Sequence, residues 1–114
     1  MFVIVAKYLI PKGYRGMTVF PFVFLKYGDD VQNNALVNHE KIHIRQQLEL
    51  LLAPFFLWYF IEFSIRLFQY KNVHLAYRNI SFEREAYNNE LDLDYLMKRR
   101  FFSFFKYLNE KRKV

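Results

Sequence analysis

The pentapeptide His-Glu-Lys-Ile-His at residues 39–43 constrains this chain more than any other part of its sequence. A helix is predicted from residues 31–34 to about residue 52, because apolar and amide side chains recur there at spacings of three and four. Two histidines four positions apart lie on one face of such a helix, with Cβ atoms about 5–6 Å apart. His39 and His43 can therefore bind one metal ion, and Glu40 lies beside them, where a carboxylate can accept a proton from a water.

Two histidines need at least one further protein ligand to hold zinc in a catalytic site. The chain has no cysteine, so this ligand must be histidine, aspartate or glutamate. The candidates after the motif are Glu62, His74, Glu83, Glu85, Glu90, Asp92 and Asp94. A helix is predicted for residues 82–97, with Ser81 as its N-cap. Glu83 and Glu85 stand out because they lie in the first turn of that helix.

The order of these motifs resembles the gluzincin class of zinc metallopeptidases, and especially its very small members, the minigluzincins. In that class an H-E-x-x-H helix is followed by a helix with E-x-x-A, here Glu-Arg-Glu-Ala at residues 83–86. The resemblance implies that the first glutamate, Glu83, is the third zinc ligand beside His39 and His43. It also implies that Glu40 is the general base of peptide-bond hydrolysis.

The chain departs from the gluzincin pattern after the third ligand. Gluzincins often carry an aspartate four residues later, which contacts a ligating histidine. Tyr87 stands at that place here, and Glu90, one turn further on, is expected to substitute for the aspartate. Glu85 is the alternative third ligand, and it points to a different face of the helix than Glu83. The candidates for stabilising a tetrahedral oxyanion are His74, Tyr77 and Tyr87.

The N-terminal quarter of the chain has the composition of β-strands. Residues 2–10 and 17–25 are rich in β-forming side chains, and the residues between them suit a turn. Pro21 cannot donate a ladder hydrogen bond, so the second strand is expected to be an edge or to be bulged there. The resemblance implies a sheet at this place, with residues 17–25 as the edge strand that pairs with a substrate backbone.

The remaining elements are predicted to be helical. A second helix is expected over residues 54–70, with Pro54 in its first turn, and a short last helix over residues 102–109. The expected fold is α+β and zincin-like, with a short N-terminal β-hairpin or small sheet followed by three to four helices. With 114 residues, the chain suits a single minigluzincin-like domain over residues 1–114.

Other side chains near the motif allow two interpretations. Gln46 and Gln47 follow His43 by three and four positions, so they reach either the surroundings of the metal or a neighbouring loop. The aromatic residues of the second helix, which include Trp58 and Tyr59, are expected to belong to the core.

The positive charge of the chain lies at its end. Residues 98–114 contain seven basic residues and one acidic residue, a net charge of +6, which equals the formal net charge of the whole chain. Four phenylalanines accompany them. This basic, aromatic segment suits an anionic membrane surface or self-association. The alternatives are a solvated basic tail and packing of the phenylalanines against the rest of the domain. Nucleic acid is not an expected partner, because no recognised nucleic-acid motif accompanies the segment. The expected substrate is a peptide or protein.

The hydropathy of the second helix predicts either a buried helix or one at a membrane surface, and not a spanning helix. Its uninterrupted apolar run is shorter than the about 20 residues that span a bilayer, and Glu62 and Arg66 are placed to pair on one face. Residues 2–6 are too short an apolar stretch for a signal peptide, so a cytoplasmic location, with membrane association, is expected.

The alternative function is a catalytically silent zinc-binding or membrane-surface interaction protein of the same fold.

Overall fold

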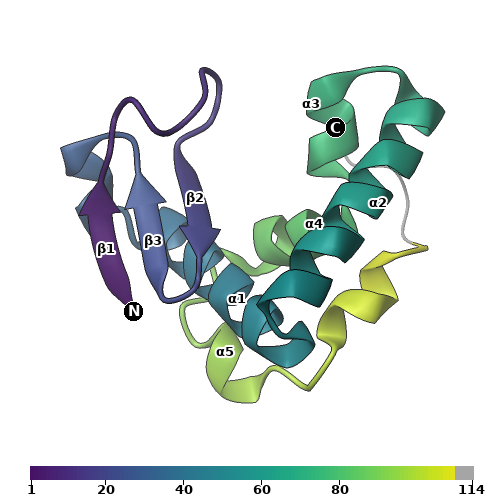
Figure 1. The fold of residues 1–114 in the computed structure, drawn as a ribbon. Helices are drawn as coiled ribbons and strands as arrows, with labels where there is room; N and C mark the ends of the chain where they lie inside the picture. Colours follow the sequence, from purple (N-terminus) through teal and green to yellow (C-terminus); the bar gives the residue numbers. More distant parts are fainter. Residues whose placement is uncertain (110–114) are drawn as a thin grey trace.

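The computed structural model describes residues 1–109 of the chain (Figure 1). The strands are β1 (Phe2–Val5), β2 (Gly16–Val19) and β3 (Phe22–Leu25). The helices are η1 (Gly28–Gln32), α1 (Asn34–Leu50), α2 (Leu52–Tyr70), α3 (Val73–Arg78), α4 (Ser81–Asn89), α5 (Tyr95–Lys98) and η2 (Ser103–Tyr107), where η marks a 3-10 helix. The predicted α+β class with a small N-terminal sheet is confirmed, although the described residues form five α-helices instead of three or four.

The sheet differs from the predicted pair of strands. Its order is β1-β3-β2, with β3 parallel to β1 and antiparallel to β2. The strand predicted over residues 2–10 ends at Val5, and the strand predicted over residues 17–25 is broken by a turn at Phe20 and Pro21. Proline has no N–H for a ladder hydrogen bond, so the continuous β-forming run folds back on itself there. The hairpin therefore joins β2 to β3 and leaves β2 at an edge of the sheet.

Helix α1 begins at Asn34, within the predicted range, and α2 begins at Leu52, two residues before its predicted start. The side chain of Asn33 accepts a hydrogen bond from the amide of Leu36 and so caps the start of α1. Pro54 lies in the first turn of α2. Among residues 1–109 no single helix is both long and apolar enough to cross a membrane, and α1 and α2 meet that test only as a pair bent by 111°.

The helix predicted over residues 82–97 is wrong in its length and its cap. It is two helices, α4 and α5, because the backbone between them turns toward α1. The amide side chain of Asn38 donates to the carbonyls of Asn89, Glu90 and Asp92. Ser81 does not cap α4 but is its first residue.

The core consists of two clusters that meet on α4. The first contains Phe55, Ile80, Phe82 and Phe104, and the second contains Ile42, Ala86 and Tyr95. Residues 81–86 of α4 are all buried, because one core cluster packs on this helix at Phe82 and the other at Ala86. Figure 1 shows the sheet on one side of α1 and the helices α2 and α3 on the other. The predicted last helix is η2, and residues 110–114 of the basic segment lie outside the described part.

Candidate metal centre

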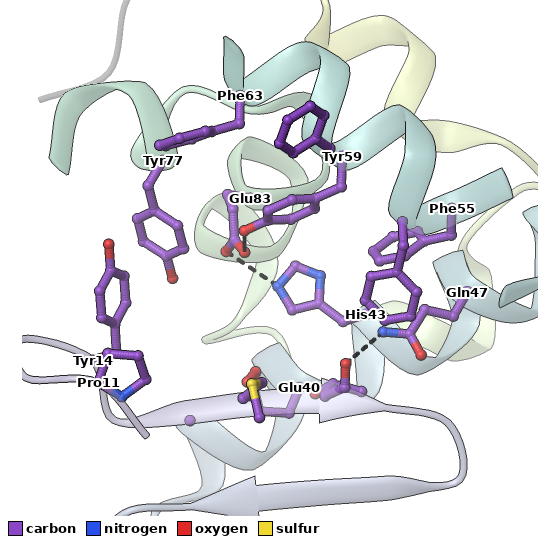
Figure 2. Close-up of a pocket in the computed structure, with 15 residues that line it drawn as sticks. Pro11, Tyr14, Glu40, His43, Gln47, Phe55, Tyr59, Phe63, Tyr77 and Glu83 are labelled. Atoms are coloured by element: carbon purple, nitrogen blue, oxygen red, sulfur yellow. Dashed lines mark hydrogen bonds and ion pairs between the residues drawn. The ribbon is translucent and has the colours of Figure 1, made fainter. Parts of the chain in front are cut away.

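Three donor atoms from α1 and α4 converge on one point. The Nε2 atoms of His39 and His43 lie 3.2 Å apart, and Oε1 of Glu83 lies 3.1 Å from each of them. The three residues are 4–6% exposed. Figure 2 shows the His43 ring and the Glu83 carboxylate pointing toward each other across the gap between the helices. The sequence motif and the helix of the third candidate ligand are thus brought together in space.

The other ring nitrogens of the two histidines face hydrogen-bond acceptors. Nδ1 of His39 lies 2.9 Å from Oε1 of Glu90, and Nδ1 of His43 lies 2.8 Å from Oε1 of Gln46. The amide nitrogen of Gln46 donates to Glu85 at 2.9 Å, so its oxygen is the atom that faces His43. Each Nδ1 is therefore the donor in its hydrogen bond, and the lone pair of each Nε2 points at the convergence.

The donor set fits zinc. Zinc binds nitrogen and carboxylate oxygen at about 2.0–2.2 Å in tetrahedral sites, which places the ligand atoms about 3.3 Å apart. The observed separations of 3.1–3.2 Å are close to that value. Two imidazole lone pairs that face each other at this distance need a proton or a cation between them, and Glu83 supplies a negative charge to balance it.

The electrostatics of the site also favour positive charge at these atoms. Burial by itself lowers the pKa of His39, but hydrogen bonds with Glu83 and Glu90 outweigh it and raise that pKa to about 10. The pKa of His43 is raised too, because the attraction of Glu83 outweighs burial. Burial alone would raise the pKa of Glu83, but the attraction of the histidines prevails and lowers it. Protons and a metal cation therefore compete for the two Nε2 atoms.

Glu40 is buried beside the two histidines with an unsatisfied carboxylate. Ligand atoms of His39, Glu40 and His43 lie within 4.8 Å of one another, and Oε2 of Glu40 has no hydrogen-bond partner in residues 1–109. Burial raises the pKa of the Glu40 carboxyl, although the positive charges of the two histidines act in the opposite direction. The carboxylate also abuts β2, where a Cβ added to Gly16 would lie 3.0 Å from Oε1 of Glu40. A carboxylate of this kind suits proton transfer.

A residue of α2, which sequence reasoning assigned to the core, completes the surroundings of Glu83. The hydroxyl of Tyr59 donates to Oε2 of Glu83 at 2.8 Å. Burial, together with the charge of Glu83, raises the pKa of Tyr59, so its hydroxyl stays a donor. No local sequence signal separates Tyr59 from the other aromatic residues of its helix.

The alternative ligand Glu85 is turned away from the histidines. Its carboxylate accepts hydrogen bonds from Tyr95 at 2.6 Å and from Arg99 at 2.5 Å, and it is fully buried. Arg99 also pairs with Glu49, so these residues tie α1 to α4 and the segment after α5. Of the two alternative third ligands, Glu83 is therefore the one whose carboxylate faces the Nε2 atoms of the histidines.

The predicted oxyanion donors His74, Tyr77 and Tyr87 all line the wall of a cavity beside the donor atoms. The ring of Tyr87 packs against the ring of His39, with centroids 4.4 Å apart, and its hydroxyl lies 3.1 Å from that of Tyr77. Tyr77 packs edge-on against Tyr14, with ring centroids 5.0 Å apart (Figure 2). His74 is exposed, and its ring centroid lies 6.4 Å from that of Tyr77. The four aromatic rings form one wall beside the donor atoms.

Two cavities open beside this site. The larger, about 530 Å³, lies between β2 and α2 and reaches Glu40, His43 and Glu83 (Figure 2). Its apolar wall on α2 is made of Phe55, Phe56, Tyr59, Phe60 and Phe63. The smaller and more polar cavity, about 210 Å³, lies on the His39 side, with Glu90 in its wall. Cavities of this size accept a side chain or a small ligand.

The edge of β2 beside the larger cavity is partly filled by a side chain of α1. The amide nitrogen of Gln47 donates to the carbonyl of Thr18, and its oxygen accepts from the amide of Phe20, both at 2.7 Å. In an antiparallel strand, alternate residues turn their backbone groups to the same side. The amide and carbonyl of Gly16 therefore face this same edge, next to Glu40.

No known protein family, curated protein or solved structure matches this chain. The resemblance to gluzincins consequently rests on the two sequence motifs and the order of the elements around them.

Proposed function

We propose that this chain is a zinc-dependent metallopeptidase. His39, His43 and Glu83 would hold the zinc, and Glu40 would be the general base. The observation that carries the proposal is the convergence of two Nε2 atoms and one carboxylate oxygen, at 3.1–3.2 Å, while both Nδ1 atoms face other acceptors. This arrangement, beside a buried carboxylate with a free oxygen, supports hydrolysis.

The residues of the chain divide the chemistry between them. Zinc bound by these donors would polarise a substrate carbonyl and lower the pKa of a water to near neutrality. Glu40 accepts the proton of the attacking water and passes it to the leaving amine. Tyr77 is assigned as the donor to the oxyanion, because it lines both cavities and burial raises its pKa, which keeps the hydroxyl protonated.

The substrate class follows from the walls of the site. An extended peptide can pair with the backbone of Gly16 at the free edge of β2, which places a carbonyl near Glu40. A large apolar side chain of that peptide fits the aromatic cavity lined by Phe55, Phe60 and Phe63. The proposal therefore includes a polypeptide substrate with an apolar residue next to the cleaved bond. A cytoplasmic location, expected from the sequence, is a separate part of the proposal.

The first test is the metal content of protein purified without added zinc. We expect zinc in the wild type and its loss in His39→Ala and Glu83→Ala. His74→Ala is the matched control, because this histidine is exposed and lies outside the donor set. Zinc retained in both ligand variants would show that the donor assignment is wrong.

The second test separates the peptidase from a zinc-binding protein without turnover. Zinc-loaded protein is incubated with a broad peptide mixture, and we expect cleavage that a chelator abolishes and zinc restores. Glu40→Gln should keep its zinc and lose the cleavage. If fully zinc-loaded wild type cleaves nothing in such a mixture, the silent zinc-binding alternative replaces the peptidase.

A further inference from the structure

The outward face of α2 is mostly apolar, and its only exposed polar side chains are Ser64, which donates to the carbonyl of Phe60, and Gln69. Of its 19 residues, only Phe55 and Glu62 are buried. The apolar stripe consists of Leu57, Ile61, Ile65 and Phe68, which are 62%, 50%, 51% and 83% exposed. These positions recur at spacings of four, four and three, so they lie on one side of the helix. A contiguous apolar surface of this kind marks an interaction site in most proteins.

The charged residues of α2 are withdrawn from this stripe. Glu62 and Arg66 pair at 3.3 Å, and their side chains are only 7% and 11% exposed. Arg66 also donates to the carbonyl of Leu108 at 2.8 Å, which directs it toward η2. No exposed charged side chain interrupts α2 from its first residue to its last. A helix that faced water would carry charges on that side.

The η2 segment, which borders α2 where Phe104 and Phe105 pack on Trp58, is aromatic and positive. The ring of Phe105 packs on Trp58 of α2 with centroids 5.4 Å apart, and 47% of Phe105 stays exposed. Lys106 follows it and is exposed, as are Arg100 before η2 and Lys71 at the end of α2. A second copy of the chain docked face to face would bring this positive border against itself, whereas an anionic lipid surface complements it.

We propose that the chain docks on an anionic membrane surface through the apolar stripe of α2, with Lys106 and Arg100 at the lipid headgroups. Phe56 and Phe60 belong to the same helix, are 40% and 67% exposed, and line the larger cavity. The docked bilayer therefore lies beside the mouth of that cavity. In a step that rests on the proposed function, this makes a polypeptide segment at the membrane surface the substrate.

The experiment is sedimentation of the full chain with vesicles of phosphatidylcholine, alone or mixed with phosphatidylserine, at low and high salt. We expect the wild type to pellet with the mixed vesicles at low salt. Ile61→Glu and Ile65→Glu place a charge in the stripe and should each weaken binding about tenfold or more. Lys106→Ser should weaken it about fivefold at low salt and less at high salt.

Two controls make the result decisive. Leu91→Glu changes an apolar side chain that is 82% exposed outside the stripe, and it should bind like the wild type. His39→Ala should also bind, since docking does not need the metal site. Circular dichroism confirms that each variant is folded. Three results would overturn the proposal. The wild type stays in the supernatant, the stripe variants bind as well as the wild type, or the wild type runs as a dimer on a sizing column and Ile61→Glu dissociates it.

Discussion

Glu62 caps the helix that carries Glu83, because its carboxylate accepts both the backbone amide and the hydroxyl of Ser81, each at 2.6 Å. The two protons come from the first residue of α4, two positions before Glu83. Tyr59, one turn earlier on α2, holds the other carboxylate oxygen of Glu83. Helix α2 therefore supports the candidate metal site through Tyr59 and Glu62, and it also forms a cavity wall and the apolar stripe.

Glu62→Ala should destabilise the fold by about 3 kcal/mol, because it removes a buried carboxylate and leaves Arg66 without its ion pair. It should also weaken zinc binding, since the start of α4 loses its cap. The measurement is urea unfolding of the metal-free protein, followed by zinc titration. Ser81→Ala removes only one of the two hydrogen bonds and should cost about 1 kcal/mol. Equal stability of the two variants would contradict the capping role.

Tyr59→Phe should lower zinc affinity about 10-fold to 100-fold, the usual effect of losing a partner that orients a ligand. The ring remains, so the packing of Tyr59 on Phe82 is kept, and the metal-free protein should lose only the about 1 kcal/mol that one hydrogen bond contributes. Competition with a chromophoric chelator measures the affinity. Tyr87→Phe is the matched control, because the Tyr87 hydroxyl contacts Tyr77 and not a donor residue. An unchanged affinity in Tyr59→Phe would remove Tyr59 from the site.

The candidate site divides into a part that sequence reasoning found and a part that it missed. Helical periodicity alone places His39 and His43 on one face with Glu40 beside them, and the resemblance to gluzincins adds Glu83. Tyr59 contacts Glu83 because α2 packs on α4, and no spacing of residues in the sequence indicates that packing. Glu90 was expected only as a substitute for an aspartate, and its place on His39 depends on where α4 ends.

The sheet was predicted in its place but not in its pairing. The run of β-forming residues from 17 to 25 is continuous, so Pro21 itself was the only sequence feature that indicated a turn there. The parallel pairing of β1 with β3 joins segments about twenty residues apart, and no local sequence signal indicates that pairing. Similarly, the ion pair of Arg99 with Glu49 spans fifty positions, and neither residue carried a motif.

The stability of the metal-free protein should fall as the pH rises from about 7 to 10. The folded-state pKa of His39 is raised from 6.5 to about 10, so its contribution is complete below pH 6.5 and is lost as the pH approaches 10. The lowered pKa of Glu83 adds stability that is lost only in acid. Melting temperatures of chelated protein at pH 6 and pH 9 should differ by about 5 °C or more. Zinc-loaded protein should show the opposite trend, because protons compete with zinc at low pH.

Gly16→Ala should reduce cleavage about tenfold or more while zinc stays bound. The new Cβ would lie 3.0 Å from Oε1 of Glu40 and 3.3 Å from Cδ2 of Leu25, so the carboxylate must move. Small displacements of a catalytic group have costs of this size. Gly28→Ala is the matched control, because a Cβ there meets no atom within 4 Å. Rates and zinc content are measured together, and equal rates in the two variants would show that Glu40 does not depend on Gly16.

Gln47→Ala should both weaken the fold and lengthen the peptide-binding edge of β2. The variant leaves the carbonyl of Thr18 and the amide of Phe20 without their 2.7 Å partners, which should cost about 2 kcal/mol in urea unfolding. The same two groups become free to pair with a substrate backbone. We therefore expect that lengthening a cleaved peptide along this edge changes kcat/KM little in the wild type and raises it in the variant. Gln69→Ala, at an exposed glutamine of α2, is the control and should match the wild type in both measurements. Equal gains from lengthening in wild type and Gln47→Ala would show that this side chain does not limit the edge.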